Sequence, residues 1–334
     1  MKRIRVLSVI LLLLLCACKT EGTEATKPSL PPCAQTVESS LREAAPEWSD
    51  TASEPIEEAN RASAAPTASP SLDPFAAYFS DVPTLSERGY RSKNVSIRIE
   101  SYAVDETYGR HVTYHVADIY VRDVTAIRTA AAQGDFGMRY TRTIRSIADD
   151  AGALLAIGGD SYTREKNSFV IRNGVLYRDT PIENTDLCIL YRDGTMETKR
   201  WGTFTAQEII DSDPWQVWGF GPALLDEHGR YMEIRHRLSG HNPRTAIGYY
   251  EPGHYCFVVV DGRGESVGVT LHSLSRLMED LGCTVAYNLD GGDSAQLYWN
   301  GEIISHACNE TRVIGDVIYL AREDEPPLSG MFSD

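Results

Sequence analysis

The sequence predicts an α+β domain in which a mixed, largely antiparallel sheet with flanking helices is built from two diverged helix–strand–turn–hairpin repeats. Candidate strands outnumber candidate helices along the chain. The tetrapeptide Gly-Gly-Asp-Ser occurs twice, at 158–161 and 291–294, and each copy follows a helix end and a short apolar strand candidate. An Asn-Gly hairpin signal and a further strand candidate come after each copy, so one supersecondary unit is expected to be used twice.

Strand candidates make up most of the predicted domain. Alternating polar and apolar residues predict strands at 96–99 and 113–121, whereas a continuous apolar run predicts a buried central strand at 257–260. Shorter strands are expected at 154–157, 169–171, 175–177, 187–191, 285–289 and 317–320. Helices are expected at 125–133, 142–150, 206–210 and 272–281. Many strands with few helices favour an α+β arrangement over a doubly wound one.

The first residues have the composition of an export signal. Basic residues precede an apolar run at 6–15, which is too short to span a membrane. The run ends in Leu-Cys-Ala-Cys, which is similar to a bacterial lipobox and predicts a lipoprotein-type signal peptide at 1–18 with Cys18 as the lipidated acceptor. The alternative is an ordinary cleaved signal followed by an unmodified cysteine. The protein is therefore expected to be exported, either anchored at the outer face of the bacterial cytoplasmic membrane or extracellular.

The predicted domain is flanked by segments without apolar periodicity. Residues 19–72 are rich in Ser, Thr, Ala, Pro and Glu, a composition that buries too little surface to offset its ordering entropy, so a disordered tether is expected. Residues 324–334 are expected to form a flexible tail. This leaves 73–323 as one folded domain that is long enough for a single core.

Charge and cysteine content narrow the class of protein. The formal net charge of -15 argues against a nucleic-acid partner, because phosphates require a basic surface. The chain has seven cysteines, and those within the domain lack a Cys-x-x-Cys pair, so a zinc–cysteine cluster is not expected. They are Cys188, Cys256, Cys283 and Cys308. Buried free thiols are expected, with one disulfide between Cys283 and Cys308 as the alternative.

The second Gly-Gly-Asp-Ser segment carries a candidate anion site. Asp290 follows a strand candidate, and the next residues, Gly291 and Gly292, permit positive φ and expose consecutive backbone N–H groups. These groups would bind a phosphate or an oxyanion beside the carboxylate. The alternative is a tight turn in which Asp290 and Ser294 satisfy backbone donors.

An arginine after an Asn-Pro turn is a second candidate. Arg244 enters a strand directly after this turn, and its guanidinium can donate two hydrogen bonds to a phosphate or a carboxylate. The alternative is a structural ion pair with an aspartate. Thr245 is either a binding hydroxyl or a strand residue, and His241 lies close by as a titratable group.

Four ordered motifs together resemble a known family. The chain contains, in this order, Gly-Phe-Gly-Pro-Ala-Leu-Leu at 219–225, Asn-Pro-Arg-Thr-Ala-Ile-Gly at 242–248, Val-Val-Val-Asp-Gly-Arg at 258–263 and Asn-Leu-Asp-Gly-Gly-Asp-Ser at 288–294. They resemble the phosphodiester glycosidase domain. The resemblance implies a catalytic domain at 73–323 that hydrolyses a sugar-1-phosphodiester bond on a cell-surface or extracellular glycan.

The resemblance also implies the site residues. The catalytic candidates are Asp290, Asp160 and Arg244, with Asp160 supplied by the first Gly-Gly-Asp-Ser copy. The candidates for substrate binding are Thr245, Asn288, Gly291, Gly292, Asp293, Ser294, Ser161, Glu310 and Arg312. The chain departs from the family at Gly158, where an asparagine is expected, and at Asp293, which adds a negative charge near a phosphate pocket. Glu310 and Arg312 are out of register with the Glu-Arg motif of the family.

The expected mechanism leaves the roles of the two carboxylates open. Either Asp160 or Asp290 would act as nucleophile or base, and the other would orient sugar hydroxyls. Arg244 and the glycine amides would stabilise the departing phosphate. No cofactor is required; a divalent cation such as calcium, bound by the oxygens of Asp160, Asp290 and Asp293, is the alternative.

A competing class is a non-catalytic glycan-binding lipoprotein of exopolysaccharide or cell-wall biogenesis. Such a protein would stack sugars on aromatic rings; the alternative is that these rings belong to the core, as aromatic residues in strands more often do. The candidates for stacking are Trp215, Trp218, Tyr287, Tyr298 and Trp299.

Overall fold

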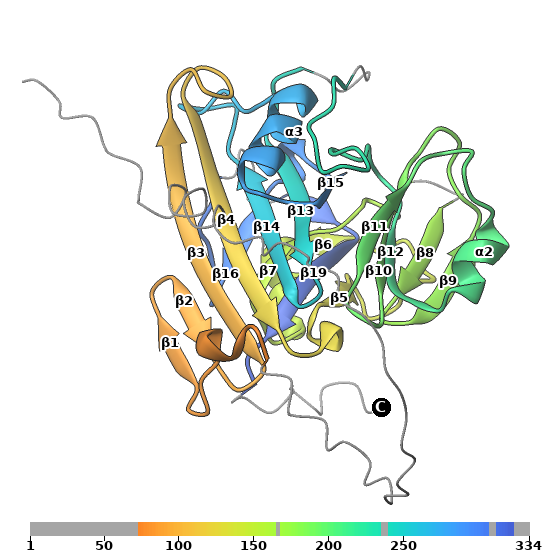
Figure 1. The fold of residues 1–334 in the computed structure, drawn as a ribbon, viewed down its shortest axis with the longest axis horizontal. Helices are drawn as coiled ribbons and strands as arrows, with labels where there is room; N and C mark the ends of the chain where they lie inside the picture. Colours follow the sequence, from red (N-terminus) through yellow and green to blue (C-terminus); the bar gives the residue numbers. More distant parts are fainter. Residues whose placement is uncertain (1–72, 165–167, 235–239, 307–311, 324–334) are drawn as a thin grey trace, which may run out of the picture. The chain divides into compact units, whose positions relative to one another are not determined.

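The computed structural model describes residues 73–164, 168–234, 240–306 and 312–323 (Figure 1). The predicted signal peptide with Cys18, the tether, the tail, Cys308 and Glu310 lie outside these residues and stay predictions. Within the described part of the chain, no helix is long and apolar enough to cross a membrane.

A seven-stranded sheet forms the largest part of the fold. Across the sheet its strands are β1 (Thr84–Ser86), β2 (Gly89–Arg91), β3 (Val95–Val104), β4 (Val112–Val121), β14 (His254–Val260), β13 (Arg244–Glu251) and β15 (Val285–Leu289). Figure 1 shows β3, β4, β14 and β13 side by side. The inner strand β14 is apolar along nearly its whole length because both of its faces are buried.

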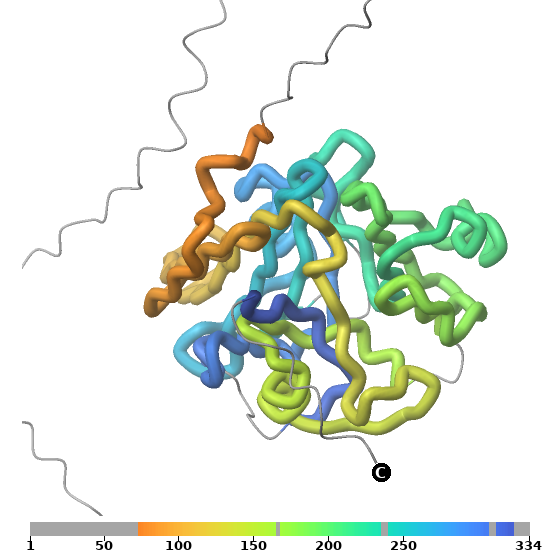
Figure 2. The backbone as a smooth tube through the Cα atoms, turned by 90° about the horizontal axis from the view of Figure 1, so that it is seen from below, coloured from red at the N-terminus to blue at the C-terminus, as the bar shows by residue number. Residues whose placement is uncertain are grey.

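Two five-stranded sheets accompany the seven-stranded sheet. One contains β11 (Met196–Lys199), β10 (Leu187–Tyr191), β12 (Pro214–Trp218), β8 (Phe169–Arg172) and β9 (Val175–Asp179) in this order. The other contains β17 (Glu302–Ile303), β16 (Leu297–Trp299), β7 (Ala153–Gly158), β19 (Asp316–Ala321) and β5 (Arg128–Ala131). Figures 1 and 2 show the first of them, in green, to one side of the seven-stranded sheet. A separate ladder joins β18 (Val313–Ile314) to β6 (Arg142–Thr143).

Each of the three α-helices of the described residues begins after a threonine that caps it. The helices are α1 (Ile144–Asp150), α2 (Ala206–Asp211) and α3 (Leu271–Asp280). The side chains of Thr143, Thr205 and Thr270 accept hydrogen bonds from backbone amides in the first turns. The buried leucines of α3 share a core cluster with Val258 and Val260, and α3 therefore covers one face of β14.

The main core lies between the seven-stranded sheet and the sheet of β7 and β19. Ile97, Ile119 and Phe257 from the first sheet belong to one buried cluster with Leu155 and Ile318 from the second. The two sheets thus bury a common apolar interior, and the ends of β7 and β15 are brought near each other.

The predicted fold class is right only in part. Every strand pair of the described residues is antiparallel, so the sheets are not mixed, and strands predominate more than the α+β class implies. β7 and β15, which precede the two Gly-Gly-Asp-Ser copies, belong to different sheets, and the duplicated unit stays a prediction.

The helix expected at 125–133 is wrong. A short 3₁₀ turn at Val124–Ala126 leads instead into β5, in which Thr129 and Ala131 are buried and their neighbours are not. Pairing of β5 with the apolar strand β19 outweighs the helix propensity of the alanines.

Candidate active site

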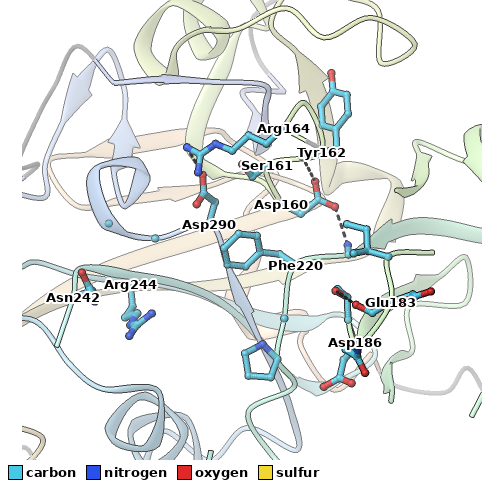
Figure 3. A pocket seen from close by; sticks show the side chains of 18 of the residues that line it. Asp160, Ser161, Tyr162, Arg164, Glu183, Asp186, Phe220, Asn242, Arg244 and Asp290 are labelled. Carbon is cyan, nitrogen blue, oxygen red and sulfur yellow. Dashed lines mark hydrogen bonds and ion pairs between the residues drawn. The ribbon is translucent and has the colours of Figure 1, made fainter. Parts of the chain in front are cut away.

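The two Gly-Gly-Asp-Ser turns meet beside a pocket of about 840 Å³ (Figure 3). The amide of Asp290 donates to the carbonyl oxygen of Gly159 at 3.1 Å. A Cβ atom on Gly158 would lie 3.2 Å from the carbonyl oxygen of Ser294, so the turns pack closely because glycine is present. The pocket lining comes from both turns, from the loops at 182–186 and 219–222, and from several arginines.

Asp290, which directly precedes the second turn, is the carboxyl there that faces the pocket. It lies just after β15 and is 7% exposed. Burial raises the pKa of Asp290, Arg164 and two serine hydroxyls oppose the rise, and the charge of Asp160 adds to it. The Nη2 atom of Arg164 lies 3.5 Å from Oδ2 of Asp290, and Figure 3 shows the two side chains pointing toward each other. Asp290 therefore has an increased proton affinity at a place that a pocket ligand can reach.

Asp160, the carboxylate of the first turn, is held by the protein on both oxygens. Its Oδ1 lies 2.7 Å from Nη2 of Arg172 and accepts from the amide of Tyr162 at 3.2 Å. Its Oδ2 accepts from the amide of Gly219 at 2.8 Å. Asp160 thus ties the first turn to the loop at 219–222, which forms another wall of the pocket.

Two charged residues behind Asp160 escaped the sequence prediction. Arg172 is fully buried, and its Nε atom lies 3.2 Å from Oδ2 of Asp316, which is also buried. Burial raises the pKa of Asp316 to about 7; Arg172 opposes this rise and the charge of Asp160 adds to it. One guanidinium thus faces two carboxylates. The sequence contained a signal for both residues, because Arg172 ends and Asp316 begins an otherwise apolar strand.

Arg244 places a buried cation in the pocket lining. It is the first residue of β13 and is 4% exposed. Its Nε donates to the carbonyl of Val269 at 3.1 Å, and its Nη2 donates to the carbonyl of Gly240 at 2.7 Å. Burial lowers the pKa of Arg244 to about 10, so the guanidinium remains protonated at neutral pH.

A further arginine of the pocket lining, Arg263, lies near the glycines of the second turn. It forms an ion pair with Asp293, and its Nη2 donates to Oδ1 of Asn242 at 3.3 Å. The negative charge that the sequence places near the pocket therefore has its own cationic partner.

The sequence analysis predicted that Gly291 and Gly292 bind an anion through their N–H groups, but in the structure both glycines also shape the turn itself. The amide of Gly292 donates to the carbonyl oxygen of Pro243 at 2.9 Å, so this N–H is already used within the protein. A Cβ atom on Gly291 would lie 2.7 Å from the same carbonyl oxygen, a distance that side chains do not adopt. Gly292 has φ of 62°. The turn therefore needs Gly291 for its close approach to Pro243 and Gly292 for its positive φ.

Only some of the predicted binding residues line the pocket. Ser161 does, with φ of 65°. Asn288 is buried and donates through Nδ2 to the carbonyl of Gly221 at 2.7 Å, which supports the loop at 219–222 from behind. Thr245 and Ser294 are also buried, and neither they nor Arg312 belong to the lining. Glu183, which the sequence prediction missed, is an exposed carboxylate of the lining.

The three aspartates considered as calcium ligands each have a different arginine beside them. Arg172 faces Asp160, Arg164 faces Asp290, and Arg263 faces Asp293. Each of the three carboxylates thus already has a cationic partner within the protein, and the calcium alternative stays a prediction.

The aromatic residues considered for sugar stacking belong to the core. All are buried or packed against the core, and none lines the pocket: Trp215, Trp218, Tyr287, Tyr298 and Trp299.

The cysteines among the described residues, Cys188, Cys256 and Cys283, are buried free thiols. The Sγ atoms of Cys256 and Cys283 lie 3.7 Å apart.

Comparison with known proteins assigns the family. The phosphodiester glycosidase family model matches residues 151–321, about half of the chain. The chain belongs to the phosphodiester glycosidase family. The part that matches the phosphodiester glycosidase model includes both turns, Arg172, Arg244 and Asp316, whereas β1 to β6 lie before it.

Two relatives show how far the likeness extends. The SPbeta prophage-derived uncharacterized protein YomE of Bacillus subtilis (strain 168) is 27% identical over an alignment of 207 residues, which covers 59% of this chain and 32% of YomE. The chain thus spans about a third of the length of this relative. The zebrafish N-acetylglucosamine-1-phosphodiester alpha-N-acetylglucosaminidase catalytic domain, auto-inhibited by its pro-peptide, superposes with a TM-score of 0.56 at 21% identity, over 69% of this chain and 84% of that chain. This likeness establishes a shared fold.

Proposed function

We propose that this protein is a hydrolase that cleaves the bond between an anomeric sugar carbon and a phosphate oxygen. The observation that carries the proposal is that one pocket contains Asp290, with its raised pKa, together with Arg164, Arg244 and Arg263. A reactive carboxyl and a cationic site for phosphate are the two groups that this reaction needs. Family membership supports the reaction class.

Arg244 is the proposed anchor for the phosphate. Its guanidinium is held in place by two backbone carbonyl groups, so little reorganisation is needed when an anion binds. Arg164 and Arg263 supply further positive charge at the same pocket. As the glycosidic C–O bond breaks, its electron pair moves to the phosphate oxygen, and these cations stabilise the negative charge that develops there.

Asp290 is the proposed reacting carboxyl, and Asp160 is a positioning residue. In its ionised form Asp290 would either attack the anomeric carbon or remove a proton from the attacking water, and an oxocarbenium-like transition state would follow. Asp160 has both oxygens engaged by Arg172 and backbone amides, and therefore holds the turn and the loop at 219–222 in place. The phosphate departs without strong acid catalysis, so the reaction does not require a second free carboxyl.

The substrate class and the location are part of the proposal. The pocket of about 840 Å³ has the size of a typical small-molecule site, which suits a sugar phosphodiester at the end of a cell-surface or extracellular glycan. The basic and apolar start of the sequence and its Leu-Cys-Ala-Cys segment support export with a lipid anchor at Cys18. A Cys18→Ser variant that still carries a labelled fatty acid in bacterial cells would contradict the anchor.

A panel of sugar-1-phosphodiesters tests the activity. Wild type, Asp290→Asn and the matched control Asp293→Asn are compared for released sugar, and NMR identifies the anomer that forms first. Wild type and Asp293→Asn should release sugar, because Asp293 belongs to a partly exposed ion pair with Arg263. Asp290→Asn should stay folded and lose activity by at least about 100-fold.

Two outcomes would count against the proposal. A folded Asp290→Asn protein with wild-type turnover would remove Asp290 from the reaction. Saturable binding of the panel by wild type without any turnover would favour the non-catalytic glycan-binding lipoprotein.

A further inference from the structure

A cluster of two histidines and an aspartate lies outside the pocket. His115, Asp261 and His306 each offer one ligand atom, and these atoms all lie within 4.8 Å of one another. They come from β4, from the residue after β14, and from the segment after β17, so only the fold brings them together. We propose that this cluster binds one divalent transition-metal ion of the zinc type.

The distances within the cluster suit such an ion. The Nε2 atom of His115 lies 3.2 Å from Oδ2 of Asp261, and the Nδ1 atom of His306 lies 3.0 Å from the same oxygen. Ligand bonds of about 2.0–2.1 Å in a tetrahedral site place neighbouring ligand atoms roughly 3.3 Å apart. An ion can therefore enter the cluster with small side-chain movements.

Neighbouring groups orient the ligands for metal binding. Ser101 is the cross-strand partner of His115, and its Oγ lies 2.7 Å from Nδ1 of that histidine. When Nδ1–H donates to Ser101, the lone pair of Nε2 is left for the metal. The backbone amide of His306 donates to Oδ1 of Asp261 at 2.9 Å, which leaves Oδ2 as the ligand atom. The hydrogen bonds from these neighbouring groups thus hold Nε2 of His115 and Oδ2 of Asp261 facing each other.

The donor set and its burial determine the kind of ion. Two imidazole nitrogens and one carboxylate oxygen suit zinc, whereas calcium prefers oxygen ligands alone. His115 and Asp261 are buried, but the side chain of His306 is 87% exposed. The ion would therefore lie at the surface, where a water molecule can fill the fourth position. Asp261 precedes the pocket residue Arg263 by two positions, so the ion would also brace the strand end that presents Arg263.

Metal stoichiometry of the full chain tests the site without any assay of activity. The chain is prepared without a polyhistidine tag, treated with chelator, incubated with zinc and desalted, and bound metal is measured by elemental analysis. Wild type should retain one equivalent, and its unfolding temperature should rise with zinc. His306→Ala should weaken zinc binding by at least about 100-fold, because even changes in the groups behind ligands cost about 10–100-fold.

The matched control is His111→Ala. His111 also forms a histidine–aspartate pair, with Asp105 at 2.6 Å, but both side chains are exposed. This variant should bind zinc as wild type does, whereas Ser101→Ala should bind it more weakly. The metal-free unfolding temperatures show whether each variant is folded. Wild-type protein that retains no zinc, or His306→Ala protein that retains as much as wild type, would overturn the proposal and leave a hydrogen-bonded cluster.

Discussion

The backbone amide of Asp290 donates a hydrogen bond to the carbonyl oxygen of Gly159, 3.1 Å away, and so joins the two Gly-Gly-Asp-Ser turns directly. The carboxylate within the first tetrapeptide, Asp160, and the one that directly precedes the second, Asp290, nevertheless have different surroundings. Asp160 is enclosed by Arg172 and two amides, whereas Asp290 faces the pocket beside Arg164. The meeting of the two turns therefore brings together one anchoring carboxylate, Asp160, and one that a ligand can approach, Asp290.

The ion pairs of Arg172 should be essential for stability. Arg172→Met leaves Asp160 and Asp316 buried without their guanidinium, and loss of one partner from a buried pair costs about 3–5 kcal/mol. The control Arg98→Met removes an exposed pair with Glu100 and should cost less than about 1 kcal/mol. Urea denaturation of both variants measures the difference. Similar losses in the two variants would show that the buried pairs contribute little.

Asp316 should make stability depend on pH. Its pKa is about 7 in the folded state against 3.8 as the ordinary value, so between these values the folded protein binds more protons than the unfolded chain. The contribution of Asp316 to stability therefore falls as pH rises through this window. Wild type should lose unfolding free energy relative to Asp316→Asn between about pH 4 and about pH 7. Asp213→Asn, whose carboxylate is exposed, should follow wild type; an Asp316→Asn profile parallel to that of wild type would contradict this assignment.

Gly291 should tolerate no side chain. A Cβ atom there would lie 2.7 Å from the carbonyl oxygen of Pro243, and backbone on both sides limits relaxation. Gly291→Ala should cost about 1–3 kcal/mol and displace Asp290, with loss of activity. The control Gly264→Ala meets open space and should change stability by less than about 0.5 kcal/mol. Thermal unfolding compares the two, and an unchanged Gly291→Ala protein would show that the turn can move.

Local sequence patterns predicted the strands better than the arrangement of the sheets. Alternation at 96–99 and 113–121 and the apolar run at 257–260 fall within β3, β4 and β14, because period and burial are visible over a few residues. The segment at 125–133 was misassigned because its conformation depends on pairing with β19, which lies far along the chain.

The residues of the candidate site were likewise predictable where a local motif contains them and not where their role depends on distant contacts. Asp290, Arg244 and Gly291 could be found because each belongs to a short motif with a local conformational reason. The order of residues along a strand does not tell which face is solvent-accessible, and Thr245, next to Arg244, is buried away from the pocket. Arg172 contacts a partner 144 residues away, and no local pattern encodes that pairing.

Arg164 should set the pH dependence of the proposed reaction. Its guanidinium lies 3.5 Å from Asp290 and lowers the pKa of that carboxyl against the effect of burial. Arg164→Gln should therefore raise the pKa of Asp290, and the limb of the kcat/KM profile that reports Asp290 should move to higher pH. The control Arg263→Gln removes a comparable pocket charge whose partner is Asp293, and should alter KM while that limb stays in place. A profile measured on one sugar-1-phosphodiester with all three proteins separates these effects. If the limb of Arg164→Gln coincides with that of wild type, either Arg164 does not act on Asp290 in solution or the limb belongs to another group.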